Sequence, residues 1–325
     1  KFVGDILFNL AWCLLDQNSL SEAGYLLERS LAITKKELGR EHPNFGNTLH
    51  SIVGVYTRSG SYAQALPFAE EALKIATEMH GPRNPEVTQS LNNLAGILDS
   101  LGQSRKAALL FKEALEIREE FLGSDHFELA NALNNLAGVL LDTGDLEESE
   151  SMYKRALVIK QKHLPAMHVD IALALNNLAY LYERKGAFAQ ATPLFEEAAE
   201  IIETISGINN PQTAVAFSNL ANNYRRGKRF SDASALFQKS LRIFEQTTSR
   251  GNPSYAATLT AYSRLLRDEG EIDAVRKTLK LRLLSELENL SINLLSLSEA
   301  ECFQYIEKQW GPEDFLVSLI NSQSK

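Results

Sequence analysis

Asparagine side chains recur along this chain at a fixed spacing and could form a binding surface. The positions of this column, each 42 residues after the one before, are Asn9, Ser51, Asn93, Asn135, Asn177, Asn219 and Ala261. A side-chain amide both donates and accepts hydrogen bonds, so a column of amides can pair with the backbone of an extended peptide whatever its sequence. The alternative is that these amides bond to neighbouring helices or to water.

Arginines lie at a second position in the same register, seven residues after two of the amides. The predicted cationic, amide-rich pocket comprises Asn177, Asn219, Asn222, Arg184, Arg226 and Arg264. We expect Arg184 and Arg226 to be adjacent in space because they are one repeat apart. A guanidinium group binds a carboxylate through two parallel hydrogen bonds, which predicts an acidic peptide or a chain terminus as the ligand. The neighbouring charges at 225–229 are typical of a solvated turn.

Residues suited to catalysis or metal binding are scattered. His42, His126 and His168 fall in equivalent positions of different repeats, which separates them along the array. Cys13 lies in an apolar stretch and is expected to be a buried core residue, and Cys302 has no histidine near it in sequence. No glycine-rich phosphate loop or nucleophile elbow is present. The sequence predicts no enzyme activity, no cofactor and no metal site.

The elements that must position the amides follow from the same spacing. The pair Leu-Ala recurs at 10–11, 94–95, 136–137, 178–179 and 220–221, and apolar residues between these pairs follow helical periodicity. Glycines that could end a helix in a left-handed turn are Gly60, Gly102, Gly144, Gly186 and Gly270. Lys228 stands in this column in place of glycine, and the adjacent Gly227 is expected to adopt the left-handed conformation instead. Each unit is therefore predicted to be two helices joined by a tight turn.

Small and large residues alternate in a way that would let the helices interlock. The small positions are Ala23, Ala65, Ala107, Ser149, Ala191 and Ala233, and the bulky positions four residues later include Leu27, Phe111, Tyr153, Phe195 and Phe237. The predicted units are 1–42, 43–84, 85–126, 127–168, 169–210, 211–252 and 253–294, followed by a short helical tail at 295–325. A fixed period of this size indicates a stacked array.

The order Leu-Ala, Gly, Ala, aromatic, Ala resembles the tetratricopeptide repeat. Asn-Asn-Leu-Ala at 92–95, 134–137 and 176–179, and Gly-x-x-His-Pro at 39–43, resemble its kinesin light chain subtype. The resemblance implies an all-α, right-handed superhelix whose first helices line a concave groove. It also implies that Asn93, Asn135, Asn177 and Asn219 point into this groove, because asparagines at this position clamp peptide backbones in kinesin light chains. Gly96 and Gly138 would leave room there for a bulky ligand side chain.

The tail suggests a second possible role. Residues 294–301 resemble the connector in bacterial proteins that carry a caspase-like CHAT protease domain after such repeats. On this reading the chain is the regulatory or sensor array of a larger effector, and its partner is a C-terminal domain of the same polypeptide. The chain opens at Lys1 almost where a repeat should open, so we expect it to be a trimmed portion of something larger. The alternative is a tail that only packs over the last repeat.

Composition limits the remaining possibilities. The chain has 325 residues, of which 44% are hydrophobic and 23% charged, with a net charge of −8. This acidic balance argues against nucleic acid as a partner. The apolar runs are too short to span a bilayer, and two distant cysteines make no disulfide framework, which favours a reducing cytoplasm. We therefore predict a cytoplasmic protein-interaction scaffold that binds an extended, acidic peptide or protein segment.

Overall fold

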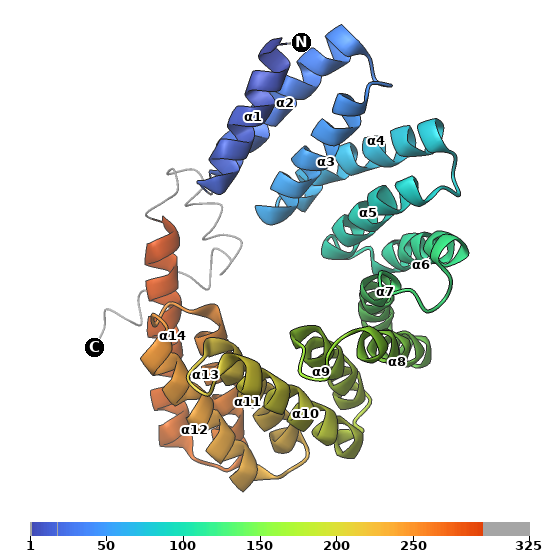
Figure 1. Cartoon of the computed structure of the whole chain (residues 1–325). Helices are drawn as coiled ribbons and strands as arrows, with labels where there is room; N and C mark the ends of the chain where they lie inside the picture. The colour runs from blue at the N-terminus through green and yellow to red at the C-terminus, as the bar shows by residue number, and fades with distance from the viewer. Residues whose placement is uncertain (1, 18, 295–325) are drawn as a thin grey trace. The chain divides into compact units, whose positions relative to one another are not determined.

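A computed structural model describes residues 2–17 and 19–294, which form fourteen α-helices in seven consecutive pairs (Figure 1). The helices of the first four pairs are α1 (Phe2–Asp16), α2 (Leu20–Leu38), α3 (Pro43–Arg58), α4 (Tyr62–His80), α5 (Thr88–Ser100), α6 (Ser104–Leu122), α7 (Leu129–Thr143) and α8 (Leu146–His163), with a 3-10 turn, η1 (Pro85–Val87), before α5. The remaining helices are α9 (Val169–Arg184), α10 (Phe188–Ser206), α11 (Pro211–Arg226), α12 (Phe230–Thr247), α13 (Pro253–Asp268) and α14 (Ile272–Leu294). The predicted all-α fold is confirmed, and no strand occurs in these residues.

The helices form two compact units, which are described separately. The first contains residues 1–166 and 173–185, so it holds α1 to α8 and most of α9. Of the described residues, the second contains 167–172 and 186–294, which form the start of α9 and α10 to α14. The predicted tail at 295–325 lies outside the described residues.

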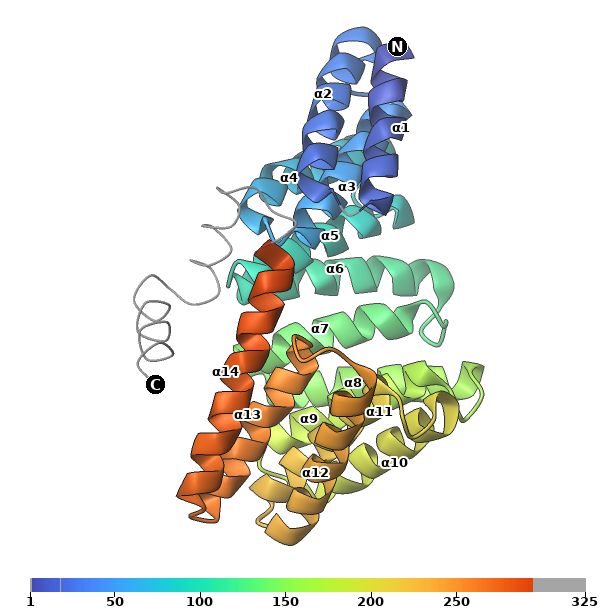
Figure 2. The same ribbon diagram turned by 90° about the vertical axis from the view of Figure 1, so that its left-hand side faces the viewer.

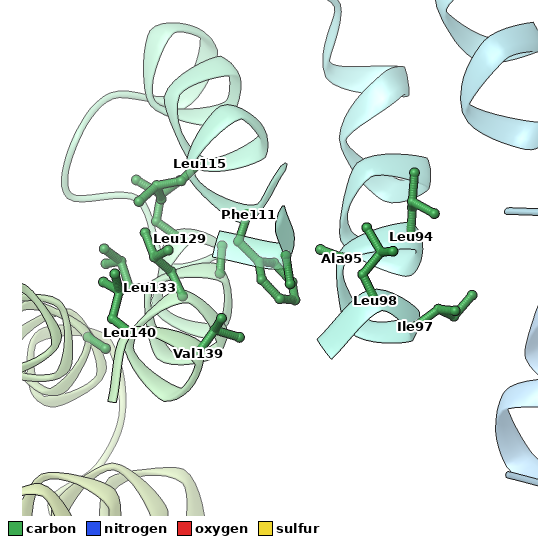
Figure 3. Close-up of a cluster of buried hydrophobic side chains, with 14 of the residues drawn as sticks. Leu94, Ala95, Ile97, Leu98, Phe111, Leu115, Leu129, Leu133, Val139 and Leu140 are labelled. Atoms are coloured by element: carbon green, nitrogen blue, oxygen red, sulfur yellow. The ribbon is translucent and has the colours of Figure 1, made fainter. Parts of the chain in front are cut away.

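In the first unit, α2, α4 and α6 each pack against their own partner and against the odd-numbered helix that follows. Ala23, Ala65 and Ala107 are fully buried, so the backbones approach closely at these positions. Figure 3 shows the core around Phe111 of α6, which lies between Leu98 of α5 and Val139 of α7. The alternation of small and bulky residues thus builds hydrophobic clusters that neighbouring pairs share.

The second unit follows the same pattern. α11 packs on α10 and α12, and α13 packs on α12 and α14. The last two helices lie side by side in both views (Figures 1 and 2). The ring of Phe237 in α12 lies 5.8 Å from the ring of Tyr262 in α13, and Phe237 is fully buried. Aromatic contacts of this kind join one helix pair to the next.

Histidines begin several of the odd-numbered helices. His42 Nδ1 accepts a hydrogen bond from the Asn44 N–H at 3.2 Å, and His168 Nδ1 accepts one from the Asp170 N–H at 3.1 Å. Equivalent positions in other pairs are filled by asparagines, whose side-chain oxygens accept from the same turn; these are Asn84, Asn210 and Asn252. The histidine column therefore supplies helix caps, a role that its spacing did not reveal.

The turn between α11 and α12 corrects one expectation. Gly227 keeps a negative φ of −77°, and Lys228 itself adopts the left-handed conformation with φ 62°. Lys228 is the only residue other than glycine with positive φ among the described residues. The hydrogen bonds of the turn fix the position that must be left-handed, so a neighbouring glycine cannot take over the role.

Replacing Lys228 with glycine should stabilise the protein by about 1 kcal/mol, because glycine has no Cβ to clash in this conformation. Urea unfolding measures the change. The reciprocal substitution, Gly186→Lys at the equivalent turn where φ is 75°, should destabilise the chain by a similar amount. Equal stability of Lys228→Gly and the unaltered chain would contradict the assignment of strain to this residue.

Candidate peptide-binding surface

One face of the odd-numbered helices in the first unit is exposed along its length. α3, α5 and α7 lie along one side of the stack, with α4, α6 and α8 along the other (Figure 1). Residues spaced three or four apart on each odd helix share this side. We call it the odd-helix face; it comprises Asn47, Ser51, Gly54, Arg58, Gln89, Asn93, Gly96, Ser100, Asn131, Asn135, Gly138, Asp142, Leu173, Asn177, Tyr180 and Arg184, all exposed or partly exposed.

Glycines leave open space at the middle of this face. A Cβ atom added to Gly54 or Gly96 would have no atom of another group within 4 Å, and one added to Gly138 would meet only the Tyr153 hydroxyl at 3.5 Å. Three successive odd helices therefore present bare backbone where a neighbouring group could approach. The next odd helix changes this pattern, because Tyr180 of α9 fills the equivalent position and is 44% exposed.

Two asparagines of the odd-helix face contact the neighbouring odd helix. Asn177 Nδ2 donates a hydrogen bond to Asn134 Oδ1 at 2.8 Å, which joins α9 to α7. Asn93 Nδ2 lies 3.5 Å from His50 Nδ1, which joins α5 to α3, and burial lowers the pKa of His50. Asn135, in contrast, is exposed. The amide nitrogens of Asn93 and Asn177 thus serve contacts between helices, and their oxygens are not used in these two contacts.

Arg184 lies at the end of α9 with its side chain exposed. A hydrogen bond with Tyr180 raises the pKa of Arg184, and the negative charge of Asp142 on α7 contributes in the same direction. The guanidinium group therefore interacts with the hydroxyl group of Tyr180 and with the charge of Asp142. Any acidic ligand would compete with Asp142 for this charge.

The other predicted residues belong to the second unit. Asn219, Asn222 and Arg226 are partly exposed on α11, and Arg264 is exposed on α13. The Arg226 guanidinium lies 5.3 Å from the centre of the Phe188 ring, a cation–π contact. The predicted pocket therefore divides between the two units, and the adjacency of Arg184 and Arg226 stays a prediction.

Arg225 has a role that the sequence did not indicate. It lies in the charge run at 225–229, yet its side chain is only 14% exposed and its Nη1 is 2.7 Å from Asp268 Oδ2. Its Nε and Nη2 donate to Asn222 Oδ1 at 3.3 Å. Arg225 thus joins α11 to α13 and orients the amide of Asn222. Asp268 follows Arg225 by 43 residues, one residue more than the repeat length. The stacking of the helices therefore brings Arg225 and Asp268 together.

The remaining surface offers other features away from the odd-helix face. A pocket of about 450 Å³ lies beside the end of α4, and its lining includes the ion pair of Arg40 with Glu71 and the side chains of Ile75 and Met79. In the part of the chain that the structure describes, no group of three or more His, Cys, Asp or Glu residues is placed to hold a metal ion. None of the described helices is long and apolar enough to cross a bilayer.

The expectation that Cys13 is buried is wrong. Cys13 is exposed, although the equivalent residues Val55, Ile97 and Val139 are between 1% and 4% exposed. Those residues are covered by the even-numbered helix that precedes each of them, since α2 packs on α3, α4 on α5 and α6 on α7. No described helix packs in this way on α1.

Stacked pairs of helices, each closed by a tight turn and joined through small and aromatic columns, define a helical-hairpin repeat protein. The family model of the tetratricopeptide repeat matches residues 45–120, 110–162 and 170–246, and a second model of the same repeat matches 5–44. The chain belongs to the tetratricopeptide repeat family. No curated protein matches the sequence.

Solved structures of related arrays agree in fold. A kinesin light chain-type protein of Podosopora anserina, with nearly identical TPR-like repeats, is 21% identical to this chain and has a TM-score of 0.58. The match covers 64% of this chain and 100% of that protein. BtubC (BKLC) from P. vanneervenii is 24% identical with a TM-score of 0.57, over 70% of this chain and 89% of its own. The apo form of RapI is 16% identical to this chain, with a TM-score of 0.65. The match covers 87% of this chain and 97% of RapI. The predicted tetratricopeptide repeat array is confirmed, and its structural neighbours include kinesin light chain-like arrays. Repeats of this family generally serve in protein interactions.

Proposed function

We propose that this chain is an interaction scaffold that binds an extended peptide segment along the odd-helix face of its first unit. The open backbone at Gly54, Gly96 and Gly138 carries the proposal. A peptide can approach closely where no side chain stands in its way, and its own side chains can fill the space above the glycines. The acidic net charge of −8 makes a protein ligand more suitable than nucleic acid.

The amides would hold the backbone of the peptide. Asn135 is exposed in the middle of the face, and the side-chain oxygens of Asn93 and Asn177 are left to accept hydrogen bonds outside the contacts of their nitrogens with His50 and Asn134. Because these contacts fix the orientation of the two amides, a ligand would meet groups that are already positioned. Such preorganisation lowers the entropic cost of binding.

Arg184 would favour a negative charge at one end of the bound segment. It is the exposed cation on α9, and a ligand carboxylate could replace part of its interaction with Asp142. In the second unit, Asn219, Asn222, Arg226 and Arg264 are proposed as contacts for an acidic ligand segment. We further propose that the protein acts in a reducing cytoplasm, where its two cysteines would stay as thiols.

A displayed library of random peptides tests the binding surface. Peptides that bind the chain should be lost when Gly96 is replaced with tryptophan, because the indole ring would occupy the open space; we expect a drop in affinity of about tenfold or more. The matched control is Ser151→Trp, which adds the same ring at an exposed position of α8. Peptides that bind both variants equally well would exclude the odd-helix face as the binding surface.

Charge selection is tested on the same peptides. Arg184→Gln should weaken binding of the acidic peptides by about two- to tenfold, the range of an exposed charge pair, and leave neutral peptides unchanged. Arg105→Gln, on the exposed side of α6, serves as the control for loss of one positive charge. If Arg184→Gln and Arg105→Gln have the same effect on binding, for acidic and neutral peptides alike, Arg184 does not belong to the binding site.

A regulatory array of a larger effector, such as a CHAT protease, is the second candidate. The resemblance to the CHAT connector is carried by residues 294–301. All of these except residue 294 lie outside the described residues, as does the rest of the tail. A structural neighbour from Pyrococcus horikoshii is described as a signal transduction ATPase with a tetratricopeptide repeat sensor, at 16% identity and a TM-score of 0.65 over 90% of this chain and 43% of its own. This likeness supports the fold alone.

A further inference from the structure

Tyr153 of α8 carries a polar atom that its counterparts in the bulky column lack. The residues at the equivalent position of the other even-numbered helices are Leu27, Ala69, Phe111, Phe195, Phe237 and Leu279. Tyr153 is 5% exposed, so its ring is buried as the rings of Phe111 and Phe237 are. The hydroxyl group is therefore what distinguishes this repeat from the others.

The Tyr153 hydroxyl lies beneath the odd-helix face. A Cβ atom added to Gly138 of α7 would be 3.5 Å from the hydroxyl oxygen, and among the described residues it would meet no other group within 4 Å. At Gly96 of α5, where the counterpart of Tyr153 is Phe111, an added Cβ would have no atom of another group within 4 Å. The hydroxyl thus reaches the open backbone at Gly138.

This hydroxyl has no hydrogen-bond partner in the part of the chain that the structure describes. Buried tyrosine hydroxyls normally have one, as Tyr182 does in its bond to Glu150 at 2.9 Å. The oxygen of Tyr153 is also not fully enclosed. A group that approaches Gly138 from outside can therefore bind to it.

The surroundings make the hydroxyl a donor to an uncharged acceptor. Burial raises the pKa of Tyr153 to about 12, and electrostatic interactions with Asp142 and Tyr180 contribute in the same direction. The group therefore stays protonated at neutral pH and can donate a hydrogen bond. Asp142 is exposed one helical turn after Gly138, and its carboxylate would repel a second one. The oxygen of an amide is the acceptor that suits this position.

Asn135 complements this donor. It is exposed three residues before Gly138, on the same side of α7, and its side chain has no hydrogen bond among the described residues. The side-chain oxygen of Asn135 can accept from an N–H group, while the Tyr153 hydroxyl donates to a carbonyl. The two side chains together offer what the two halves of an amide group require.

We propose that the Tyr153 hydroxyl donates a hydrogen bond to an amide carbonyl of the bound peptide over Gly138, and thereby sets the register of the peptide along the odd-helix face. This inference rests on the proposed function. The two preceding helix pairs have Ala69 and Phe111 at the equivalent position, and neither side chain can form this bond. A peptide shifted by one helix pair would lose it. The carbonyl belongs either to the peptide backbone or to an asparagine or glutamine side chain of the peptide.

Tyr153→Phe tests the bond. Peptides selected from the displayed library on the unaltered chain should bind this variant about three- to tenfold more weakly, the range for one hydrogen bond. Phenylalanine occupies the equivalent position in α6, α10 and α12, so the variant should fold, with a urea midpoint at least equal to that of the unaltered chain. Tyr25→Phe removes a hydroxyl at a position 60% exposed on α2 and should leave binding unchanged. Equal affinities of Tyr153→Phe and the unaltered chain would overturn the inference.

A double-mutant cycle tests the location over Gly138. The new Cβ of Gly138→Ala would lie 3.5 Å from the Tyr153 hydroxyl, an ordinary contact that covers the oxygen. Gly138→Ala should therefore weaken binding, and its combination with Tyr153→Phe should add little, since both changes remove the same bond. Gly96→Ala is the matched substitution in α5, and its effect should add to that of Tyr153→Phe. Full additivity for Gly138→Ala would place the bond elsewhere and refute the proposal.

Changes in the peptide identify the source of the carbonyl. Each asparagine or glutamine of a selected peptide is replaced with alanine, and each backbone amide in turn with an ester, whose carbonyl is a weaker acceptor. The replacement that weakens binding to the unaltered chain but not to Tyr153→Phe marks the acceptor, and shows whether it is a side chain or the backbone. The bond is refuted if every replacement affects the two proteins equally.

The inference and the proposed function fail in different ways. If Gly96→Trp removes binding while Tyr153→Phe does not weaken it, the odd-helix face remains the binding surface and the role of Tyr153 is wrong. If the selected peptides bind Gly96→Trp unchanged, or if the library yields no binding peptide, both proposals are wrong.

Discussion

Phe237→Ala should lower the free energy of unfolding by about 3–5 kcal/mol, the usual cost of removing a buried aromatic ring. Phe237 is fully buried in α12 and its ring contacts Tyr262 of α13. The substitution removes the apolar area of the ring and leaves a cavity between two helix pairs. Urea unfolding followed by circular dichroism measures the loss.

The loss should also be local, because each pair in a repeat array contacts only its neighbours. Hydrogen exchange should accelerate in α11, α12 and α13 and change little in α3 to α5. The control is Leu109→Ala, whose side chain is 70% exposed and whose replacement should change stability by less than about 0.5 kcal/mol. A loss of similar size for both variants would contradict the role assigned to the buried aromatic column.

Glu150→Ala should have the second largest effect, a loss of about 2 kcal/mol, the scale of hydrogen bonds to a charged group. Glu150 on α8 accepts hydrogen bonds from Lys154 Nζ at 2.6 Å, from Lys185 Nζ at 2.7 Å and from the Tyr182 hydroxyl at 2.9 Å. Its side chain is 16% exposed. Removing the carboxylate would leave Tyr182 of α9 without this acceptor, and chemical unfolding at neutral pH measures the cost.

A matched control lies one turn away on the same helix. Glu147 also pairs with Lys185 at 2.7 Å, but its side chain is 86% exposed. Exposed pairs contribute little, so Glu147→Ala should cost less than about 0.5 kcal/mol. Equal losses of unfolding free energy for Glu150→Ala and Glu147→Ala would show that the burial of Glu150 and its three hydrogen bonds do not add to stability.

The effect of Glu150 should depend on pH. Burial acts to raise the pKa of Glu150, but the hydrogen bonds from Lys154, Lys185 and Tyr182 outweigh it and lower the pKa from 4.5 to about 2. A carboxylate with a lowered pKa in the folded state stabilises the protein above its unfolded pKa, and this contribution is lost as the pH falls toward the folded pKa. The stability difference between the unaltered chain and Glu150→Ala should therefore shrink between pH 4.5 and pH 2.

The sequence alone was sufficient for the architecture. The 42-residue spacing of Leu-Ala pairs, the glycine column and the small residues such as Ala65 and Ala107 predict paired helices that stack closely, and the structure has them. These signals are local, because apolar periodicity and glycine act within one helix or one turn. Repetition then fixes the packing, since every pair meets a neighbour of the same kind.

The tertiary structure decided which side chains meet. Asn177 bonds to Asn134, and Arg225 to Asp268, each across 43 residues, and no local pattern distinguishes such a pair from two solvated groups. Lys228 is left-handed because the turn demands it, and Cys13 is exposed because no described helix covers α1, although the sequence around each indicated otherwise. Periodicity determines where a residue lies on its own helix, whereas its partners and exposure depend on which other helix lies against that face.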